Sequence, residues 1–266
     1  MSSHTSTNKA RPVFWTSGWD STYMVIRLLR AGYAVQPIYI YNPKRKSRDR
    51  ELAALDRLSA LISARIKTGQ LLPYRVFNLK DINIDPEVAQ AFDDIAAALP
   101  DGQRPLGYQY RYLASFIKQN RSEFPTVALG LEKALSPETC ACSAIIRQFG
   151  ALTPDMRIDP SSAPALVALL GDFEFPIMDT TEPEMRKQIK DWGYEDIMRE
   201  IWFCHRPIKG EPCGVCNPCS SKIAGHMDFL LPATAIGRYD NLRRIGEKYG
   251  PHAKKFRAFI YKVFHR

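Results

Sequence analysis

The chain has 266 residues, of which 45% are hydrophobic, enough to bury the core of one large domain or of one domain with an appendage. No apolar run approaches the length of a membrane span, and the polar segment 1–11 lacks the apolar stretch of a signal peptide. We therefore expect a disordered lead-in at 1–11, no membrane association, and a cytoplasmic protein whose six cysteines stay reduced.

The formal net charge is +9, and much of it lies near the end of the chain. Residues 237–266 hold nine Lys and Arg residues against Asp240 and Glu247. Such a segment is typical of a solvated basic helix, and it is equally compatible with attraction of an anionic ligand, of RNA or of an acidic partner. The sequence leaves these interpretations open.

Apolar segments and segments with helical spacing alternate along the chain. Strands are predicted at 12–16, 34–41, 74–79, 126–129 and 175–178. Helices are predicted at 21–30, 48–63, 86–99, 110–120, 182–193 and 195–202. The alternation predicts an α/β fold with a doubly wound parallel sheet. Residues 131–164 are rich in Ser, Pro and Cys, and we expect an irregular, functional loop there.

The first strand-to-helix turn has the composition of a phosphate-binding loop. Small residues let backbone N–H groups approach an anion, and the following helix N-terminus adds further donors and a favourable dipole. An aspartate in this place fits a Mg²⁺ ion that bridges it to a pyrophosphate. Helix capping by Asp20 or Ser21 is the alternative, but it explains one residue and not the whole run. The predicted turn is Thr16, Ser17, Gly18, Trp19, Asp20, Ser21 and Thr22.

Four cysteines near the C-terminal end have the spacing of a zinc site. Two-residue spacings let neighbouring thiolates converge on one tetrahedral ion. Buried thiols or disulfides are the alternatives, and the spacing favours a metal. Four thiolates leave no open coordination position, so we expect structural Zn²⁺ held by Cys204, Cys213, Cys216 and Cys219.

The turn resembles the pyrophosphate loop of the ATP pyrophosphatase (PP-loop) superfamily, whose pattern is Ser-Gly-Gly-x-Asp-Ser. Together with the cysteine cluster, it makes the chain similar to the 7-cyano-7-deazaguanine synthase family of the queuosine pathway, as a divergent member. Residues 41–45 (YNPKR), Glu51 and Gly107-Tyr108-Gln109 fall where that family has its own motifs. The resemblance implies a PP-loop (adenine nucleotide alpha hydrolase-like) domain at 12–180. It also implies a helical zinc-binding region with a basic tail at 181–266.

The resemblance further implies an ATP-dependent ligase. The carboxylate of 7-carboxy-7-deazaguanine is adenylated, ammonia gives the amide, and a second activation gives the nitrile. ATP, Mg²⁺ and Zn²⁺ are the expected cofactors, and a homodimer is the expected assembly. Asp20 and Ser21 are the expected catalytic residues, and Tyr41 joins residues 16–22 in binding the nucleotide. The expected substrate residues are Gly130, Glu132 and Cys140.

Three departures from the family pattern affect these expectations. Ser17 stands where the family has Gly, which crowds the loop if the position needs a positive φ. Thr181-Glu182 replaces a Thr/Ser-Lys pair, so a cation near the phosphates is lost. The substrate segment 130–140 is shorter than the family's and lacks its aspartates. Glu132 or Glu138 therefore becomes the candidate for binding a guanidine-like edge of the substrate through two parallel hydrogen bonds. The alternative is that both are solvated acids of a loop. Cys140 and Cys142 are compatible with substrate-loop thiols, and also with small apolar residues.

Three alternative functions remain open at this point. The activated acyl group can pass to an amine on a protein or nucleic acid in place of ammonia. The chain can be a PP-loop tRNA-modifying enzyme, as its basic end suggests. It can also be a catalytically degenerate nucleotide-binding scaffold.

Overall fold

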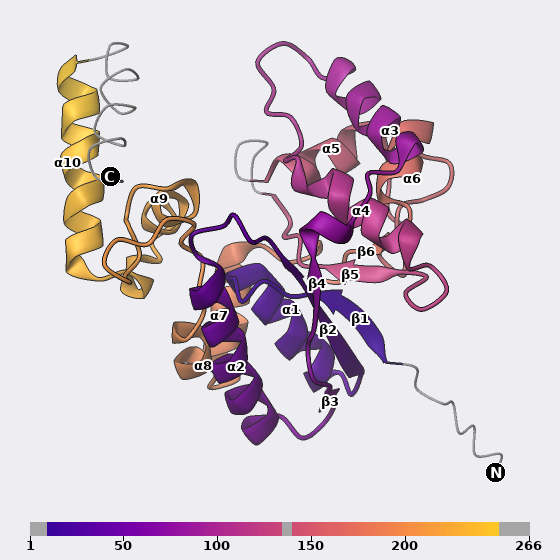
Figure 1. Cartoon of the computed structure of the whole chain (residues 1–266). Helices are drawn as coiled ribbons and strands as arrows, with labels where there is room; N and C mark the ends of the chain where they lie inside the picture. Colours follow the sequence, from indigo (N-terminus) through magenta and orange to yellow (C-terminus); the bar gives the residue numbers. More distant parts are fainter. Residues whose placement is uncertain (1–9, 135–139, 250–266) are drawn as a thin grey trace. The chain divides into compact units, whose positions relative to one another are not determined.

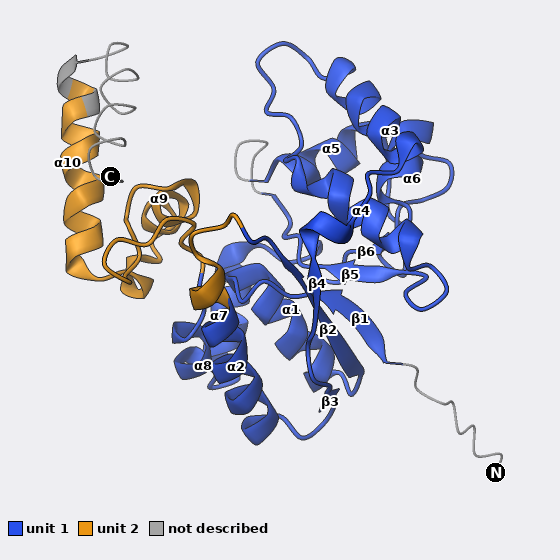
Figure 2. Ribbon diagram, in the orientation of Figure 1, with its two compact units in different colours: residues 1–43, 52–202 blue, residues 44–51, 203–266 orange. Residues whose placement is uncertain are grey.

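The computed structural model describes residues 10–134 and 140–249, which fold into two compact units (Figures 1 and 2). Unit 1 takes residues up to 43 together with 52–202, and unit 2 takes 44–51 together with the residues from 203 onward. Most of the expected lead-in, the middle of the expected substrate loop and the end of the basic tail lie outside the described residues. Residues 181–202, placed with the cysteine region from the sequence, are part of unit 1.

Unit 1 is built on a sheet whose strand pairs are all parallel in the described chain. The strand order is β3-β2-β1-β5-β6. The first part of β2 pairs with β3, and its later part pairs with β4 on the same edge. The predicted α/β class with a parallel sheet is thereby confirmed. The strands are β1 (Arg11–Phe14), β2 (Ala34–Tyr41), β3 (Gln70–Leu71), β4 (Arg75–Asn78), β5 (Val127–Leu129) and β6 (Phe173–Glu174).

Helices pack on both faces of this sheet (Figure 1). In unit 1 they are α1 (Trp19–Arg30), α3 (Pro86–Ala97), α4 (Gln109–Gln119), α5 (Ala141–Phe149), α6 (Pro164–Leu170), α7 (Glu182–Asp191) and α8 (Glu195–Arg199), with the 3₁₀ turn η1 (Leu79–Asp81). Helix α2 (Arg48–Arg65) begins in unit 2 and continues in unit 1. Unit 2 also holds α9 (Asn217–Ala224), η2 (Asp228–Leu230) and α10 (Ala233–Tyr249).

The core of unit 1 follows from the alternation of side chains along the strands. Phe14 and Ile38 are buried in a cluster with apolar residues of α3, α4, α5 and α6. Their neighbours Val13 and Tyr39 point to the opposite face of the sheet. On the helices of that side, Tyr23 of α1 stacks on Trp192 with ring centroids 5.8 Å apart. These two layers fix the carboxyl ends of β1 and β5, where the expected phosphate loop begins.

Two sequence-based expectations for secondary structure are wrong. Residues 131–164 are not irregular throughout, because Ala141–Phe149 form α5, with Cys142, Ile145 and Ile146 buried at helical spacing. Residues 175–178 form no strand; Met178 N–H donates to the carbonyl oxygen of Phe175 in a turn that follows β6. Phe175 and Ile177 are fully buried there, so their apolar character reflects the core and not strand pairing.

Candidate active-site turn and metal centre

The turn after β1 lies where the sheet changes its winding direction. β1 pairs with β2 on one side and with β5 on the other, and the chain reaches β5 only after completing β2, β3 and β4. In open parallel sheets, ligands bind at the carboxyl ends of the strands at such a reversal. The structure therefore places the predicted phosphate loop at the general ligand position of this fold class.

Ser17 has a backbone conformation that favours glycine. Its φ is 58°, which is the left-handed region, and its side chain is fully buried. The Ser17 hydroxyl donates to the carbonyl oxygen of Thr16 at 2.6 Å, and the Ser17 carbonyl oxygen accepts from the N–H of Trp202 at 3.0 Å. These bonds hold a non-glycine residue in a conformation that costs about 1–2 kcal/mol. The position therefore does have the positive φ that would favour Gly over Ser.

Helix α1 starts inside the turn with no side-chain cap. Its N-cap residue is Gly18, which has no side chain to accept hydrogen bonds from the N–H groups of the first turn. The hydroxyls of Thr16 and Ser21 lie 3.3 Å apart at the mouth of the turn, and Thr16 is exposed. A helix N-terminus flanked by two hydroxyls is suited to binding an anionic oxygen.

Two residues of the predicted turn face the core. The Thr22 hydroxyl accepts a hydrogen bond of 3.0 Å from Nε1 of Trp15, and both residues are fully buried. The Trp19 side chain is 4% exposed. Asp20 is half-buried in the first turn of α1. Thr16, Gly18 and Asp20 thus form the accessible part of the turn, whereas Ser17, Trp19, Ser21 and Thr22 are buried beneath it.

Gly130 follows β5 and touches the start of α1. A Cβ atom at this position would lie 2.9 Å from both Cα and N of Ser21 and 3.0 Å from the carbonyl carbon of Asp20. Only a glycine allows the segment after β5 to approach the α1 backbone so closely. The first expected substrate residue is therefore brought directly against the expected catalytic pair.

The other expected substrate residues lie near the same point. Burial, with the nearby charges of Glu132 and Asp20, raises the pKa of Cys140 to about 11, so this side chain is a neutral thiol at pH 7. Burial likewise raises the pKa of Cys142. Neither thiol has the lowered pKa of a nucleophile. Tyr41 ends β2 opposite Asn78 of β4, at the same carboxyl edge of the sheet.

The four predicted zinc ligands converge in unit 2. Their sulfur atoms all lie within 4.8 Å of one another, and all four residues are buried. Two sulfur pairs, Cys213–Cys219 and Cys204–Cys216, are separated by 3.9 Å. A tetrahedral zinc ion with Zn–S bonds of about 2.3 Å requires sulfurs about 3.8 Å apart. The donor set and its spacing fit a bound metal ion.

Backbone N–H groups donate hydrogen bonds to two of the four sulfur atoms. Cys213 Sγ accepts from the N–H groups of Val215 at 3.4 Å and Cys216 at 3.2 Å, and Cys204 Sγ accepts from the N–H of Cys213 at 3.2 Å. Hydrogen bonds among the four thiols, first of all with Cys204, lower the pKa of Cys213 and bring that of Cys216 to about 7. The same hydrogen bonds raise the pKa of Cys204, first through Cys213, and of Cys219, first through Cys204, so without a metal ion the cluster holds thiols beside thiolates. Thiolates are the form that binds metal.

The chain around the cysteines is ordered by a hairpin and by α10. Ile208 and Glu211 exchange both backbone hydrogen bonds, with Lys209 at φ 50° and Gly210 at φ 82° between them, as a tight two-residue hairpin turn requires. Arg238 of α10 donates to the carbonyl oxygens of Cys213 at 2.8 Å and Pro212 at 3.0 Å. The sequence pattern did not reveal this contact, because an arginine with helical neighbours carries no sign of a backbone partner.

A second contact in unit 2 joins residues that are distant in sequence. Nη2 of Arg45 lies 3.0 Å from Nε2 of His205, and Arg45 also pairs with the buried carboxylate of Glu51 at 3.4 Å. The Ser47 hydroxyl donates to Glu51 at 2.6 Å. Burial and then the Arg45 charge lower the pKa of His205. Arg45 and Glu51 had been singled out only by resemblance, and His205 had no signal beyond its place beside Cys204.

Comparison with known proteins adds no assignment: no protein-family model matches this chain, and no curated protein sequence is significantly similar to it. Within the described residues, no helix is both long enough and apolar enough to cross a lipid bilayer.

Proposed function

We propose that the protein is an ATP-dependent carbon–nitrogen ligase of PP-loop type that activates a carboxylate by adenylation. The observation that carries the proposal is the turn Thr16–Ser21, which presents an uncapped helix N-terminus at the reversal point of a parallel sheet. If β3 and β4, which both pair with β2, are counted as one interrupted strand, the strand order becomes 3-2-1-4-5, which matches the first five strands of a doubly wound nucleotide-binding sheet.

The roles of the residues follow from charge and position. Backbone N–H groups of the turn and the hydroxyls of Thr16 and Ser21 would hold the phosphates, and Asp20 would hold a Mg²⁺ ion that neutralises their charge. The carboxylate oxygen of the substrate attacks the α-phosphorus and pyrophosphate leaves. Ammonia then attacks the acyl carbon and AMP leaves with the carboxylate oxygen. The protein mainly positions two anions, so no nucleophilic Ser or Cys is required.

The proposed substrate is 7-carboxy-7-deazaguanine. The oxygen of the amide formed first attacks the α-phosphorus of a second ATP, and pyrophosphate leaves. AMP then leaves with that oxygen, and the nitrogen loses both of its protons, which gives the nitrile. Gly130 packs against the backbone of Asp20 and Ser21, and Cys140 lies near the charges of Glu132 and Asp20. Gly130, Glu132 and Cys140 are the residues proposed to contact the deazapurine. The four-cysteine site, with every ligand position filled by sulfur, has the proposed role of stabilising unit 2.

The test is carboxylate-dependent exchange of labelled pyrophosphate into ATP, followed by mass spectrometry of the products formed with ammonium. Asp20→Asn should lower exchange by at least about 100-fold, because the bridging Mg²⁺ loses its protein ligand. Asp101→Asn, in an exposed turn of the same unit, is the matched control and should not alter it. The absence of adenylate, amide and nitrile with metal-replete protein would refute the proposal.

A second candidate function is a scaffold that binds ATP without catalysing a reaction. It is favoured by the buried left-handed Ser17 and by Glu182, an acid in the first turn of α7 where the resemblance has a lysine. This candidate predicts saturable ATP binding without AMP formation. Transfer of the acyl group to a protein or nucleic-acid amine is distinguished from both by a mass increase on the acceptor.

A further inference from the structure

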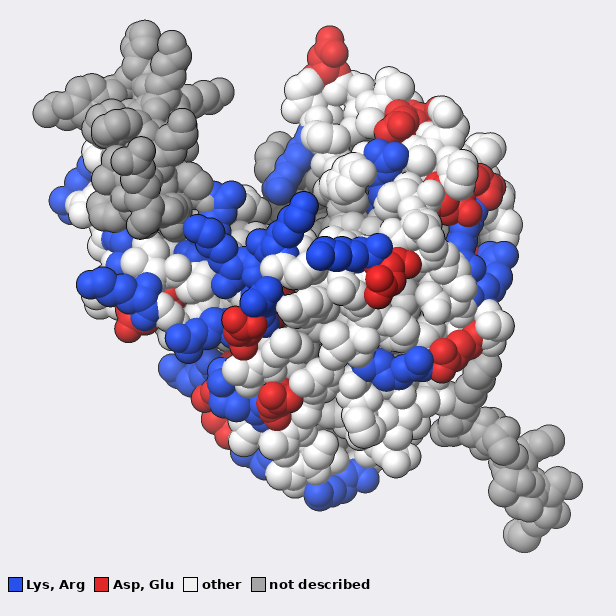
Figure 3. Space-filling model, viewed as in Figure 1, with Lys and Arg blue, Asp and Glu red and all other residues white. Residues whose placement is uncertain are grey.

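The net charge of the protein belongs almost entirely to unit 2. Residues 44–51 and 203–266 hold 17 of the 37 Lys and Arg residues but only 6 of the 28 acidic residues. Their formal charge is therefore +11, against −2 for the remainder of the chain. On the face shown in Figure 3, Lys and Arg side chains outnumber acidic ones over the part that Figure 2 colours as unit 2. Such a concentration costs self-repulsion unless an anionic partner offsets it.

Two segments of unit 2 bring exposed cations together. Arg45 contacts His205 at 3.0 Å, and a Cβ on Gly210 would clash with the guanidinium of Arg50. Segment 44–51 therefore lies along the hairpin that follows Cys204. The exposed cations that this contact gathers are called the basic face: Lys44, Lys46, Arg50, Arg206 and Lys209.

The basic face is held on a rigid support. Lys209 occupies the tip of the two-residue hairpin at φ 50°, a conformation rarely adopted by a residue with a long side chain. The hairpin Ile208–Glu211 lies between Cys204 and Cys213, so the four-cysteine cluster brings together the segments that flank it. Segment 44–51 is ordered internally by the buried carboxylate of Glu51, which binds Arg45 and Ser47. Ordering these cations beforehand reduces the entropy lost when they bind a partner.

We propose that the basic face of unit 2 binds the phosphodiester backbone of a nucleic acid strand. Lysine and arginine from two segments provide several phosphate contacts in succession, and arginine can bind a phosphate through two parallel hydrogen bonds. A lipid surface fits less well, because stable membrane attachment needs inserted apolar side chains. Among the described residues, Phe229 is the only large apolar side chain exposed in unit 2, and it does not belong to the basic face.

This binding has a defined dependence on salt. Each neutralised phosphate of a single strand contributes about −0.7 to the slope of log K against log salt. Five contacts give a slope of about −3.5, so affinity falls about 100-fold between 50 and 200 mM salt. The inference is independent of the proposed ligase activity, because the basic face shares no residue with the turn Thr16–Ser21.

The test measures fluorescence anisotropy of a labelled single-stranded RNA of about 20 nucleotides, and of the DNA of the same sequence, with the full chain. The triple variant Lys46→Gln, Arg50→Gln and Lys209→Gln should weaken binding at least tenfold at 50 mM salt and reduce the slope by about 2. The matched control removes the same charge from exposed positions of unit 1: Lys67→Gln, Lys80→Gln and Arg104→Gln. It should weaken binding less than threefold.

Circular dichroism and zinc content establish that both triple variants are folded. Equal binding of RNA and DNA, or preference for either, supports the proposal, and the comparison shows whether the 2′-hydroxyl contributes. The proposal is overturned if no saturable binding occurs at 50 mM salt, or if the two triple variants lose affinity equally. It is also overturned if vesicles rich in phosphatidylserine or a polyglutamate peptide bind more tightly than either strand.

Discussion

The carbonyl oxygen of Ser17 accepts a hydrogen bond of 3.0 Å from the backbone N–H of Trp202. The bond ties the turn after the first strand to the last residue of unit 1. Because Ser17 is also left-handed at φ 58°, this bond and the bond from the Ser17 hydroxyl to Thr16 together stabilise a strained turn. The candidate phosphate loop is therefore fixed by the end of the unit as well as by its own residues.

The stability of Ser17 variants should depend on how well each residue tolerates the positive φ at this position. Ser17→Gly removes the strain but loses a hydrogen bond and adds freedom to the unfolded chain, so stability should change by less than about 1 kcal/mol. Ser17→Val keeps the strain, adds a branched side chain to a filled site and loses the bond, which should cost at least about 2 kcal/mol. Urea unfolding measures both free energies. A valine variant as stable as the wild type would contradict the assigned conformation.

Gly130→Ala tests the contact between the segment after β5 and α1. Its Cβ would lie 2.9 Å from backbone atoms of Ser21, which cannot shift without moving the helix, so we expect a loss of about 1–3 kcal/mol. Displacement of the α1 N-terminus should also reduce the stabilisation of the protein by ATP and Mg²⁺ in thermal unfolding.

The control for this substitution is Gly107→Ala. The nearest atoms to a Cβ at Gly107 belong to the flexible Gln109 side chain at 3.7 Å, so its stability should change by less than about 0.5 kcal/mol. Equal losses at Gly107 and Gly130 would show that the close approach to Ser21 is not what requires a glycine.

The sequence predicted the elements with strong periodicity and missed those defined by tertiary contacts. β2 was predicted with its observed bounds, because AVQPIYIY is apolar and flanked by Gly and Pro. The convergence of the cysteines followed from their spacing. Helix α5 was missed because Ser, Pro and Cys around it resemble a loop. The contact of Arg45 with His205 spans 160 residues and has no local signal, so only the folded chain reveals it.

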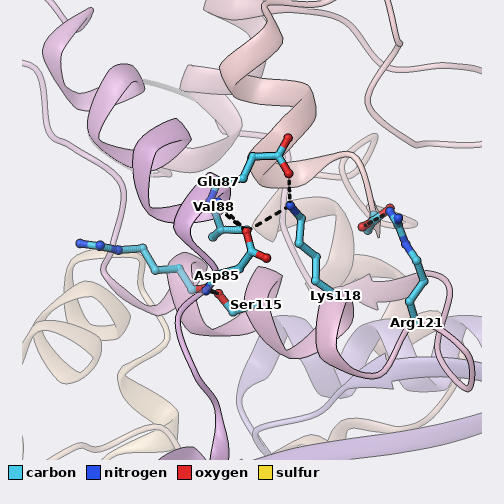
Figure 4. Close-up of polar contacts among 8 residues, drawn as sticks. Asp85, Glu87, Val88, Ser115, Lys118 and Arg121 are labelled. Atoms are coloured by element: carbon cyan, nitrogen blue, oxygen red, sulfur yellow. Dashed lines mark hydrogen bonds and ion pairs between the residues drawn. The ribbon is translucent and has the colours of Figure 1, made fainter.

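The start of α3 gives a prediction for pH. The Asp85 carboxylate accepts hydrogen bonds from the N–H groups of Glu87 at 3.0 Å and Val88 at 3.1 Å, and Lys118 Nζ lies 3.3 Å away (Figure 4). Partial burial opposes the charge, but the Val88 N–H, Lys118 and the Glu87 N–H outweigh it and lower the pKa of Asp85. Asp85→Ala should therefore cost about 1 kcal/mol at pH 7 through the lost helix cap.

This cost should become smaller in acid. A carboxyl whose pKa is lowered by folding stabilises the native state above the ordinary aspartate pKa of about 3.9, and this stabilisation is lost as the pH falls through the lower, folded value. The difference between wild type and Asp85→Ala should thus be constant from pH 7 to about 5 and shrink below about 4. Urea unfolding across this range measures it, with Asp85→Asn as a control that keeps a capping oxygen without the charge. A difference that grows in acid would contradict the lowered pKa.

Removal of the metal should release α10 from the cysteine loop. Gly214 has φ 79°, and a Cβ there would lie 2.7 Å from the carbonyl carbon of Ala235 in α10, so helix and loop are in close contact. Arg238 binds two carbonyl oxygens of the same loop, and these lie where they do only while the cysteines converge. We expect one zinc ion per chain, lost in Cys219→Ser but retained in the control Cys140→Ser.

Chelation should then increase amide hydrogen exchange in α10 at least about tenfold, which corresponds to about 1.4 kcal/mol of lost local stability, while exchange in β1 and β5 stays unchanged. Arg238→Ala should produce the same local increase with the metal still bound, because it removes the hydrogen bonds between α10 and the cysteine loop but none of the metal ligands. Full protection of α10 in metal-free protein would show that the helix docks without the cysteine loop being ordered. Increased exchange across the sheet would show that the metal stabilises the whole chain and not unit 2 alone.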